Sequence, residues 1–343
     1  MPGLYSVWMD GWERRLANRD KNRRYRPFDW GLEWLSGISL PGFHAEADGD
    51  PAAWMERFIS AALANSACFY GYSTPNDYRL DGSHLTFSSP GGCPYPENNT
   101  VHADFFPAGN DRAVLVLPQW NAGADGHHGL CRLLNRFGIT ALRMSMAYHD
   151  RRMPAELERA DYHVSSNLGR TIHAVRQSVV DARSCLDWLE GRGYRRLAIL
   201  GTSLGSCVAF VTSAHDRRVG TGVYNHISMN FGDVVWTGLS TGHVRKGLEE
   251  GVTQEQLGRY WSIISPSSFF HLMEGRTTPN LLIWTRHDTT FLPIYSRQVV
   301  EAFRSRGMPH QVLTLPCGHY TLGQFPFNLM DGLAMCRFLA GNL

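Results

Sequence analysis

The stretch from Leu197 to Ser206 constrains the fold of this chain more than any other. An apolar run typical of a buried strand ends in Gly201-Thr202-Ser203-Leu204-Gly205, and a helical pattern of small and apolar residues follows. This order is typical of a strand, a sharp turn and a helix, with the serine at the turn. Glycines flank the serine where a tight turn leaves no room for side chains. The pattern predicts that Ser203 stands above the end of a sheet, beside helix N-terminal N–H groups that stabilise negative charge.

Length and composition bound the class of protein. The 343 residues suffice for one large α/β domain or two smaller ones, and 43% hydrophobic and 19% charged residues are ordinary for a globular chain. A net charge of +2 and the lack of a nucleic-acid motif argue against a nucleic-acid binder. We find no apolar run as long as a membrane span and no secretory signal, so we expect no integral membrane segment. The seven cysteines include no Cys-x-x-Cys pair, which favours reduced thiols and a cytoplasmic location.

Strand and helix patterns alternate along residues 101–343. The predicted strands of this part are 113–117, 139–144, 196–200, 221–227, 280–286 and 311–315. The predicted helices are 129–137, 171–189, 294–306 and 329–339. This alternation predicts an α/β fold with a mostly parallel central sheet and helices on both faces.

Residues 1–100 are expected to be an extension that packs on this α/β domain. Residues 51–67 have the spacing of a helix, and residues 84–88 and 101–107 have the pattern of short strands that open the sheet. The extension is therefore predicted to be partly helical and to continue into the sheet.

The first 50 residues combine tryptophans and leucines with an arginine-rich stretch from Arg14 to Arg26. We prefer a helical arm that packs its tryptophans on the domain, because Glu13 and Asp20 dilute the positive charge. A basic arm that contacts a membrane surface or an acidic partner is the alternative interpretation.

Two stretches interrupt the alternation of strands and helices. Residues 146–169 are polar and irregular, and residues 228–268 mix glycine, threonine and serine with short helical pieces. Each follows the end of a predicted strand, so both should lie over the carboxyl edge of the sheet, where open α/β folds bind ligands. We expect short insertions that form a lid or a substrate pocket, with the second as the preferred lid.

Ser203 needs two partners to act as a nucleophile, and the sequence offers both. A base must take the serine proton, and a third group, usually a carboxylate, must orient that base. On this kind of sheet the order along the chain is Ser, Asp or Glu, His. Asp288 follows the predicted strand 280–286, and His319 follows the last predicted strand. Each alone is also explained as a turn or strand-end residue, but the intact order favours a triad. Asp233 is the alternative acid.

On these residues the sequence resembles the α/β-hydrolase superfamily. The resemblance covers roughly residues 100–343 and rests on Gly201-Thr202-Ser203-Leu204-Gly205, on Arg286-His287-Asp288-Thr289 and on Gly318-His319. It implies an α/β-hydrolase fold in which residues 101–343 are the catalytic domain. It also implies that Ser203 is the nucleophile, that His319 is the general base and acid, and that Asp288 is the orienting carboxylate. No cofactor is implied.

The resemblance further implies an oxyanion hole with two N–H donors. Leu204, the residue after the nucleophile, is the first by position. The second is assigned to the Trp120 backbone, with Gln119 as runner-up, because the loop after strand 113–117 lacks the His-Gly of many family members. Trp120 is equally consistent with a wall of the acyl pocket or with a core position. The candidate substrate-pocket residues are Gln119, Asn121, His149 and Tyr320.

Asp125, His127 and His128 invite a metal interpretation, which we reject. Three ligands so close along one turn offer poor geometry for one ion, and zinc sites usually take ligands from separate elements. No metal is therefore expected. His149 and residues 150–152, at the start of the first insertion, are instead candidates for contact with a polar substrate.

The expected activity is that of a serine hydrolase that cleaves a carboxylic ester through an acyl-enzyme. A peptidase or amidase of the same fold is the alternative, because the fold does not select the bond. A second alternative is a non-catalytic binding protein that keeps the hydrolase shell, which the intact Ser-Asp-His set argues against. A third is a lipid hydrolase held at a surface by the basic arm. The expected partner is a small-molecule ester, and acyl length, physiological substrate and oligomeric state stay open.

Overall fold

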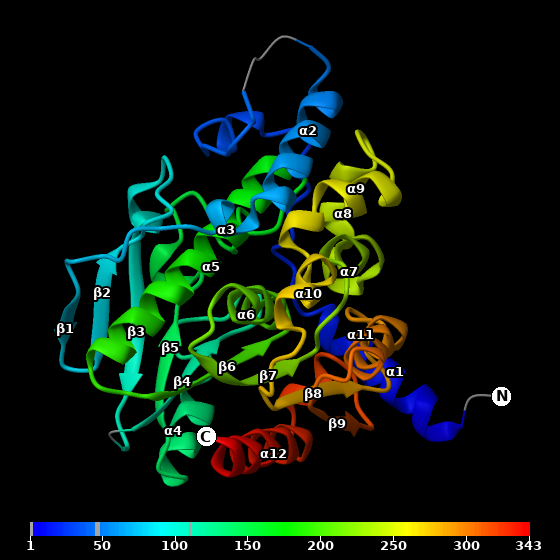
Figure 1. The fold of residues 1–343 in the computed structure, drawn as a ribbon. Helices are drawn as coiled ribbons and strands as arrows, with labels where there is room; N and C mark the ends of the chain where they lie inside the picture. Colours follow the sequence, from blue (N-terminus) through cyan, green and yellow to red (C-terminus); the bar gives the residue numbers. More distant parts are fainter. Residues whose placement is uncertain (1–2, 45–48, 110) are drawn as a thin grey trace.

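A nine-stranded sheet forms the centre of the computed structural model, which describes residues 3–44, 49–109 and 111–343 (Figure 1). The strand order is β1-β2-β3-β5-β4-β6-β7-β8-β9. Strands β1, β2 and β3 run antiparallel to their neighbours, and β4 to β9 are parallel. The mostly parallel sheet that the sequence predicted is therefore confirmed. The strands are β1 Arg79–Asp81, β2 His84–Ser88, β3 Thr100–Phe106, β4 Arg112–Leu117, β5 Thr140–Met144, β6 Arg196–Thr202, β7 Val219–Asn225, β8 Asn280–Thr285 and β9 His310–Leu315.

The side chains of the central strands alternate between two apolar layers. On β4, Leu115 and Leu117 belong to one buried cluster, and Val114 and Val116 belong to the other. Successive side chains of a strand point to opposite faces, so a strand that is apolar throughout needs cover on both. The central strands, which are apolar along their whole length, therefore need a layer of helices on each face of the sheet.

Helices cover both faces of the sheet (Figure 1). Buried residues of α5 and α6 join the cluster on one face, and those of α4 and α12 join the cluster on the other. The helices are α1 Leu4–Ala17, α2 Pro51–Ala64, α3 Ser66–Phe69, α4 His128–Arg136, α5 Leu168–Gly191, α6 Leu204–His215, α7 Phe231–Thr237, α8 Gly242–Leu248, α9 Gln254–Tyr260, α10 Phe270–Met273, α11 Pro293–Ser305 and α12 Phe327–Asn342. The helices predicted in residues 101–343 are present at their expected places.

Local capping sets where several helices begin. Asp50 accepts a hydrogen bond from the Ala52 N–H at 3.1 Å, and a proline follows at the first position of α2. Asn167 accepts a hydrogen bond from the Arg170 N–H at 2.7 Å at the start of α5. Such side chains satisfy N–H groups that have no partner within the helix, and proline fits the first turn.

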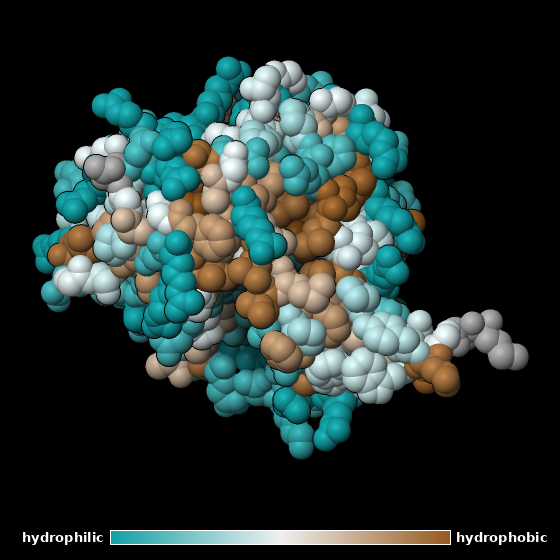
Figure 2. Space-filling view, turned by 90° about the horizontal axis from the view of Figure 1, so that it is seen from below, coloured by the Kyte–Doolittle hydropathy of each residue, from teal (hydrophilic) through white to brown (hydrophobic). Residues whose placement is uncertain are grey.

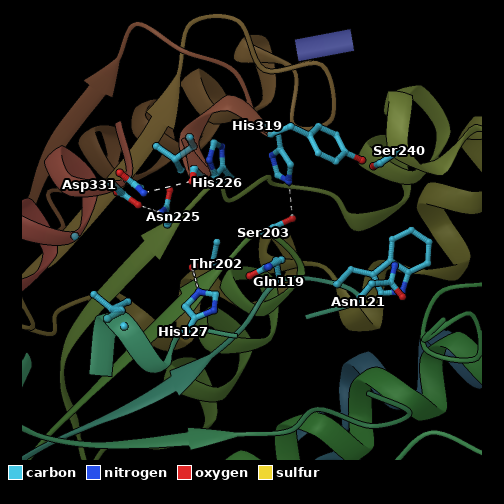
Figure 3. Close-up of a pocket in the computed structure, with 18 of the residues that line it drawn as sticks. Gln119, Asn121, His127, Thr202, Ser203, Asn225, His226, Ser240, His319 and Asp331 are labelled. Carbon is cyan, nitrogen blue, oxygen red and sulfur yellow. Dashed lines mark hydrogen bonds between the residues drawn. The ribbon is translucent and has the colours of Figure 1, made fainter. Parts of the chain in front are cut away.

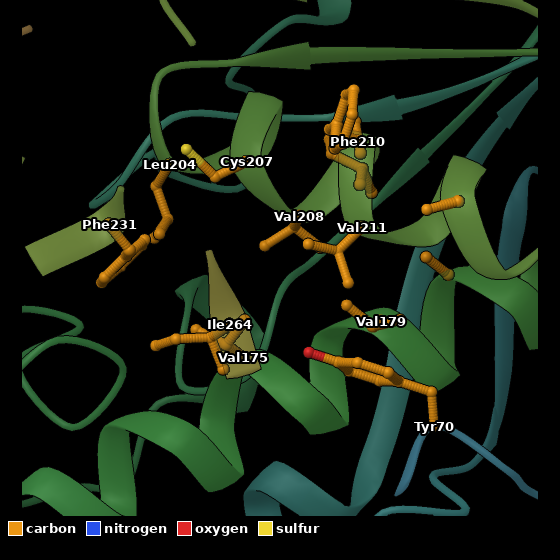
Figure 4. Packing of buried hydrophobic residues seen from close by; sticks show 14 of the residues in the cluster. Tyr70, Val175, Val179, Leu204, Cys207, Val208, Phe210, Val211, Phe231 and Ile264 are labelled. Atoms are coloured by element: carbon orange, nitrogen blue, oxygen red, sulfur yellow. The ribbon is translucent and has the colours of Figure 1, made fainter. Parts of the chain in front are cut away.

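The larger apolar cluster fills the space between α6 and its neighbours (Figure 4). Valines of α5 and α6 face each other there. Phe210 of α6 is fully buried, and its ring centroid lies 4.7 Å from that of Phe270, 5.5 Å from that of Tyr224 and 6.1 Å from that of Phe303. The helix that follows Ser203 is therefore anchored by a cluster of aromatic rings.

Helix α1 of the N-terminal arm lies at the carboxyl ends of β8 and β9 (Figure 1). Asp10 lies 3.1 Å from His287, which follows β8, and the Tyr5 hydroxyl donates a hydrogen bond to the Pro316 carbonyl, which follows β9. Met9 and Leu16 of α1 are buried, but Trp8 is 56% exposed. Trp12 and Trp30 pack against the buried clusters of the domain. The expectation that the tryptophans of the arm pack on the domain therefore holds for these two residues and does not hold for Trp8. Further along, Asp29 forms a β-bridge with Asn167, which ties the arm to the first insertion.

The surface of the molecule is mixed in polarity. Seen from below, hydrophobic residues gather toward the middle of the face, and hydrophilic residues occupy much of its margin (Figure 2). None of the helices within the described residues combines the length and the hydropathy that crossing a bilayer would require.

We expect Phe210→Ala to lower the free energy of unfolding by about 3–5 kcal/mol, because it opens a cavity in a closely packed aromatic cluster. Urea denaturation followed by circular dichroism measures this change. Leu4→Ala, at a side chain that is 92% exposed, is the control and should change the same quantity by less than about 0.5 kcal/mol. Equal effects of the two substitutions would contradict the assignment of Phe210 to the core.

Candidate active site

Ser203 stands at a sharp turn between β6 and α6. Its backbone has φ 56° and ψ −120°, a conformation that costs energy for a residue with a side chain. The Ser203 N–H donates a hydrogen bond of 2.7 Å to the Asn225 carbonyl at the end of β7. The strand, turn and helix predicted around Ser203 are present, and the turn is held from the neighbouring strand.

Two glycines make this turn possible. A Cβ at Gly201 would lie 2.2 Å from the Gly205 carbonyl oxygen, and a Cβ at Gly205 would lie 2.3 Å from the Leu117 carbonyl oxygen. Both distances are well below van der Waals contact, and backbone atoms have little freedom to move aside. The glycines therefore let β6, α6 and the end of β4 pack closely around Ser203.

Ser203, His319 and Asp288 form one line of hydrogen-bonded side chains. Ser203 Oγ lies 3.1 Å from His319 Nε2 (Figure 3), and His319 Nδ1 lies 3.2 Å from Asp288 Oδ2. Each residue follows the carboxyl end of a parallel strand, namely β6, β8 or β9. The structure brings together the three residues that the sequence analysis grouped, in a geometry in which His319 can take the Ser203 proton.

Asp288, rather than Asp233, faces His319. Asp288 Oδ1 accepts hydrogen bonds of 2.8 and 2.7 Å from two backbone N–H groups of its own turn, and this leaves Oδ2 for the histidine. Asp233 lies in α7, where its carboxylate accepts hydrogen bonds of 3.0 and 2.9 Å from an asparagine and a glutamine of the second insertion. The carboxylate of Asp233 is thus engaged elsewhere.

A second histidine, His226, also contacts Asp288. Its Nδ1 lies 2.7 Å from Asp288 Oδ2, and its ring centroid lies 4.6 Å from that of His319. His226 is buried and has a positive φ of 59°. The sequence analysis missed this residue because it fell inside the predicted strand 221–227, whereas β7 ends at Asn225. The signal that could have found it was a histidine at the carboxyl end of a strand that neighbours Ser203.

The three titratable groups shift one another's pKa. Burial alone would lower the pKa of His319, but the Asp288 carboxylate outweighs burial and raises that pKa above its usual 6.5. Burial lowers the pKa of His226, and Asp288 offsets this only in part. Burial would raise the pKa of Asp288, but the two histidines hold it well below its usual value. His319 is therefore the stronger base of the two histidines.

Glu13 of α1 fixes the loop that carries His319. Its carboxylate is fully buried and accepts hydrogen bonds of 2.9 Å from the backbone N–H groups of both Tyr320 and Thr321. The Thr289 hydroxyl, next to Asp288 in the other loop, donates to the same carboxylate at 3.3 Å. The arm thus holds the loops after β8 and β9 together.

The sequence analysis treated Glu13 only as an acid that dilutes the charge of the arm. A better signal was available in the pattern of the helix. Glu13 lies one turn after Met9 and one turn before Leu16, and all three are buried on the same side of α1. An acid on the apolar stripe of a helix predicts a buried partner, although it does not say which.

A cavity of about 860 Å³ opens beside Ser203. The candidate pocket residues Gln119, Asn121 and Tyr320 line it. His149 is not among its lining residues, because it is buried with its Nδ1 2.8 Å from the Ala147 carbonyl oxygen. The structure therefore places three of the four predicted pocket residues at the site and His149 away from it.

A second, smaller pocket of about 40 Å³ adjoins Ser203 and is mostly apolar. Both insertions contribute to it, which agrees with their expected part in a substrate pocket. Its lining residues are Trp120, Val164, Ser203, Leu204, Cys207, Phe231, Val234, Val235, Ser240, Thr241, Thr290 and Phe291.

Trp120 is fixed as a wall between the loop after β4 and the two insertions. Its Nε1 donates a hydrogen bond of 2.9 Å to the Ala160 carbonyl, and its ring stacks on His243 with 5.9 Å between centroids. The residue lines both cavities. Of the two side-chain roles considered for Trp120, the pocket wall therefore fits better than a core position.

The histidines that invited a metal interpretation turn to different partners. His127 Nε2 lies 3.0 Å from Thr202 Oγ1, and His128 Nε2 lies 3.0 Å from Asp104 Oδ2. Within the described residues, the potential metal-ligand atoms that do lie close together belong to His226, Asp288 and His319, and these atoms are all within 4.8 Å of one another. These atoms already contact one another or Ser203, so we assign no ion to them.

Comparison with solved structures finds proteins that are similar to this chain in fold. No protein-family model matches the chain, and no curated protein matches it significantly. Acetyl xylan esterase from Paenibacillus sp. R4 is similar over 96% of this chain and 99% of its own, with a TM-score of 0.57 and 15% identity. Acetyl xylan esterase 1 from Thermoanaerobacterium sp. JW/SL YS485 is similar over 92% and 99%, with a TM-score of 0.58 and 14% identity.

A peptidase is also among the structural neighbours. The acylaminoacyl peptidase of Pyrococcus horikoshii is similar over 81% of this chain and 43% of its own, with a TM-score of 0.60 and 13% identity. At such low identities the likeness establishes a shared fold alone.

We expect Glu13→Gln to shift the pH dependence with which a fluorophosphonate probe labels Ser203. Labelling requires neutral His319, so in the unmodified protein its rate should rise with pH around a midpoint above 6.5. The Glu13 charge contributes to the raised pKa of His319, so its removal should move the midpoint to lower pH. Loosening of the His319 loop should also lower the plateau several-fold.

Asp10→Asn is the matched control for this substitution. It removes a carboxylate from the exposed side of the same helix, where Asp10 lies 3.1 Å from His287. The control should leave the midpoint unchanged. An unchanged midpoint in Glu13→Gln as well would show that Glu13 does not act on His319.

Proposed function

The chain has the α/β-hydrolase fold, and we propose that it is a serine hydrolase that cleaves carboxylic esters. The observation that carries this proposal is the hydrogen-bonded line from Ser203 through His319 to Asp288, at 3.1 and 3.2 Å, at the mouth of a cavity. Acyl transfer to water is the reaction that such a line supports. Two of the structural neighbours are named as acetyl xylan esterases, which agrees with cleavage of an ester bond.

The reaction proceeds in two steps. Ser203 Oγ attacks the ester carbonyl carbon while His319 Nε2 takes the serine proton. The tetrahedral intermediate collapses, the alcohol leaves with the proton from His319, and an acyl-enzyme remains. Water, deprotonated by His319, then attacks the acyl carbon, and the acid and the free serine are released. Asp288 keeps Nδ1 protonated and stabilises the imidazolium in both steps.

Two backbone N–H groups would stabilise the oxyanion of each intermediate. Leu204 is the first residue of α6, where a helix leaves N–H groups without internal partners. Trp120 lies in the loop after β4, which approaches Gly205 closely, and Gln119 precedes it as the alternative donor. Within the described chain, none of these three N–H groups donates to a loop carbonyl.

The apolar pocket sets the size of the acyl group. Its volume is about 40 Å³, which is room for about three water-sized groups at ~10–15 Å³ each. Its walls include Leu204, Phe231 and Val234, which offer no charged partner. An acetyl to butyryl group fits this space, whereas a long chain does not. The proposed substrates are therefore short-chain esters.

We expect hydrolysis of para-nitrophenyl esters from acetate to palmitate to require Ser203. Ser203→Ala should lower kcat by at least about 1,000-fold. Ser36→Ala, at an exposed serine, is the matched control and should not change kcat.

In the unmodified protein kcat/KM should be at least about tenfold lower for the octanoate ester than for the acetate ester, because the longer acyl chain overfills the pocket. No cleavage of any ester combined with cleavage of a para-nitroanilide would favour the amidase alternative. Failure of a fluorophosphonate to label Ser203 would favour a non-catalytic protein.

We expect Asp288→Asn and Asp233→Asn to differ in their effect on turnover. Asp288→Asn should lower kcat by about 10⁴ because His319 loses the group that fixes its tautomer. Asp233→Asn should change kcat by less than about threefold, because the Asp233 carboxylate accepts its hydrogen bonds from two side chains of the second insertion. Steady-state kinetics on para-nitrophenyl acetate measures both. The reverse order of effects would identify Asp233 as the acid.

A further inference from the structure

A buried acid without a counter-ion borders the large cavity at α12. Asp331 is 6% exposed and Asn225 is 1% exposed, and both line the cavity that contains Ser203 (Figure 3). Asn225 Nδ2 donates a hydrogen bond of 2.8 Å to Asp331 Oδ2. In the described part of the chain, Asp331 Oδ1 and Asn225 Oδ1 have no hydrogen-bond partner.

Two buried oxygens without donors need an explanation. Such atoms have given up their hydrogen bonds to water, so they are rare in folded proteins. Burial raises the pKa of Asp331 to about 7, and the hydrogen bond from Asn225 opposes this only in part. Among the residues that the structure describes, no positive side chain forms an ion pair with Asp331 to offset this cost. A purely structural pair would be expected to satisfy its oxygens within the protein, and this pair does not.

The pair lies next to the reacting serine. Asn225 is paired in register with Thr202, the residue before Ser203, and its carbonyl oxygen accepts the Ser203 N–H at 2.7 Å. Ser203, Asn225 and Asp331 line the same cavity, so a group attached to an ester carbonyl at Ser203 can extend within that cavity to Asn225 and Asp331. The acyl pocket has its own lining, which includes neither of these two residues.

The charges at the rim of the same cavity are paired with one another. Asp20 lies 3.6 Å from Arg159 and 3.5 Å from Arg23, and Glu158 lies 2.6 Å from Arg24. Among the described residues, these charges at the rim are therefore neutralised by one another, and Asp331 is the acid of the lining that they leave without a counter-ion. The other polar groups of the lining are three histidines, amides and hydroxyls, including Asn22, Gln119, Asn121, Ser240, Tyr320 and Asn328. Apolar side chains line the cavity as well, namely Trp120, Leu130, Leu133, Leu322, Leu329 and Met335. A neutral ligand that combines an apolar ring face with hydroxyl groups fits such a cavity.

We propose that Asn225 and Asp331 form a subsite that binds hydroxyl groups on the alcohol portion of the ester. The substrate class is then a short-chain acyl ester of a polyhydroxylated alcohol, and the large cavity holds the alcohol. Each unpartnered oxygen accepts one hydroxyl hydrogen of the bound alcohol. This inference rests on the proposed function, because it assumes that an ester binds at Ser203.

The first experiment compares two acetates whose alcohols have rings of similar size. Cyclohexyl acetate offers no hydroxyl group, and a methyl glucoside monoacetate offers three. Release of acetate by the full chain is followed in a pH-stat. We expect kcat/KM to be at least about tenfold higher for the glucoside, since a site built to bind hydroxyls rejects the analogue that lacks them. Equal values of kcat/KM for the two acetates would overturn the proposed subsite.

The second experiment removes the acceptor. Asp331→Asn keeps the shape of the side chain and should lower kcat/KM for the glucoside acetate about tenfold, mainly through KM, with a smaller loss for cyclohexyl acetate. Asp125→Asn, at a carboxylate that is 98% exposed and outside the cavity lining, is the matched control and should leave the ratio of the two values unchanged. An equal loss on both acetates would indicate a structural role and overturn the proposal.

A binding measurement covers the case in which Asp331→Asn folds poorly. Free methyl glucoside should slow fluorophosphonate labelling of Ser203 in the unmodified protein, and cyclohexanol at the same concentration should not. Equal protection by both, or by neither, would overturn the subsite. If Ser203 is not labelled and neither acetate nor any para-nitrophenyl ester is cleaved, the proposed function fails and the subsite with it. Cleavage of para-nitrophenyl acetate without a preference for the glucoside overturns the subsite alone.

Discussion

The strained backbone at Ser203 is the constraint on which the rest of the site depends. A residue with φ 56° keeps that conformation only if its surroundings hold it there. Here β6 lies between β4 and β7, so the turn is braced from both sides. Gly205 packs on the end of β4, and Asn225 of β7 accepts the Ser203 N–H. The loop after β4 contains Trp120, and β7 ends at Asn225, so the same two strands also contribute residues to the lining of the large cavity.

The partner loops of Ser203 are held from a distant part of the chain. Loops at the end of a sheet are mobile by default, because few contacts order them. The buried Glu13 carboxylate takes N–H and hydroxyl donors from the loops after both β8 and β9, and so restricts Asp288 and His319 together. The N-terminal arm is therefore part of the site, and its place beside β8 and β9 gives it a role that neither of its sequence interpretations included.

The two cavities beside Ser203 are built from separate parts of the structure. The small apolar pocket is built largely from the second insertion, through α7 and its neighbours. The large cavity, of mixed polarity, is built mainly from the arm, the loop after β4, α4 and α12. Ser203, Ser240 and Trp120 are shared by both. If the small pocket holds the acyl group and the large cavity holds the alcohol, as we propose, selectivity for the two can change independently, because few residues line both cavities.

The sequence by itself determined the sheet, the turn at Ser203 and the grouping of Ser203 with Asp288 and His319. These follow from local periodicity and from one topological rule, that parallel strands bring their carboxyl ends to one edge. Only the tertiary structure placed His149 outside the lining of the large cavity. It also decided which partners Glu13, His226 and Asp331 contact. Each depends on a side-chain contact between elements far apart in the chain. Periodicity reveals which face of an element is buried, whereas the packing of whole elements decides what that face meets.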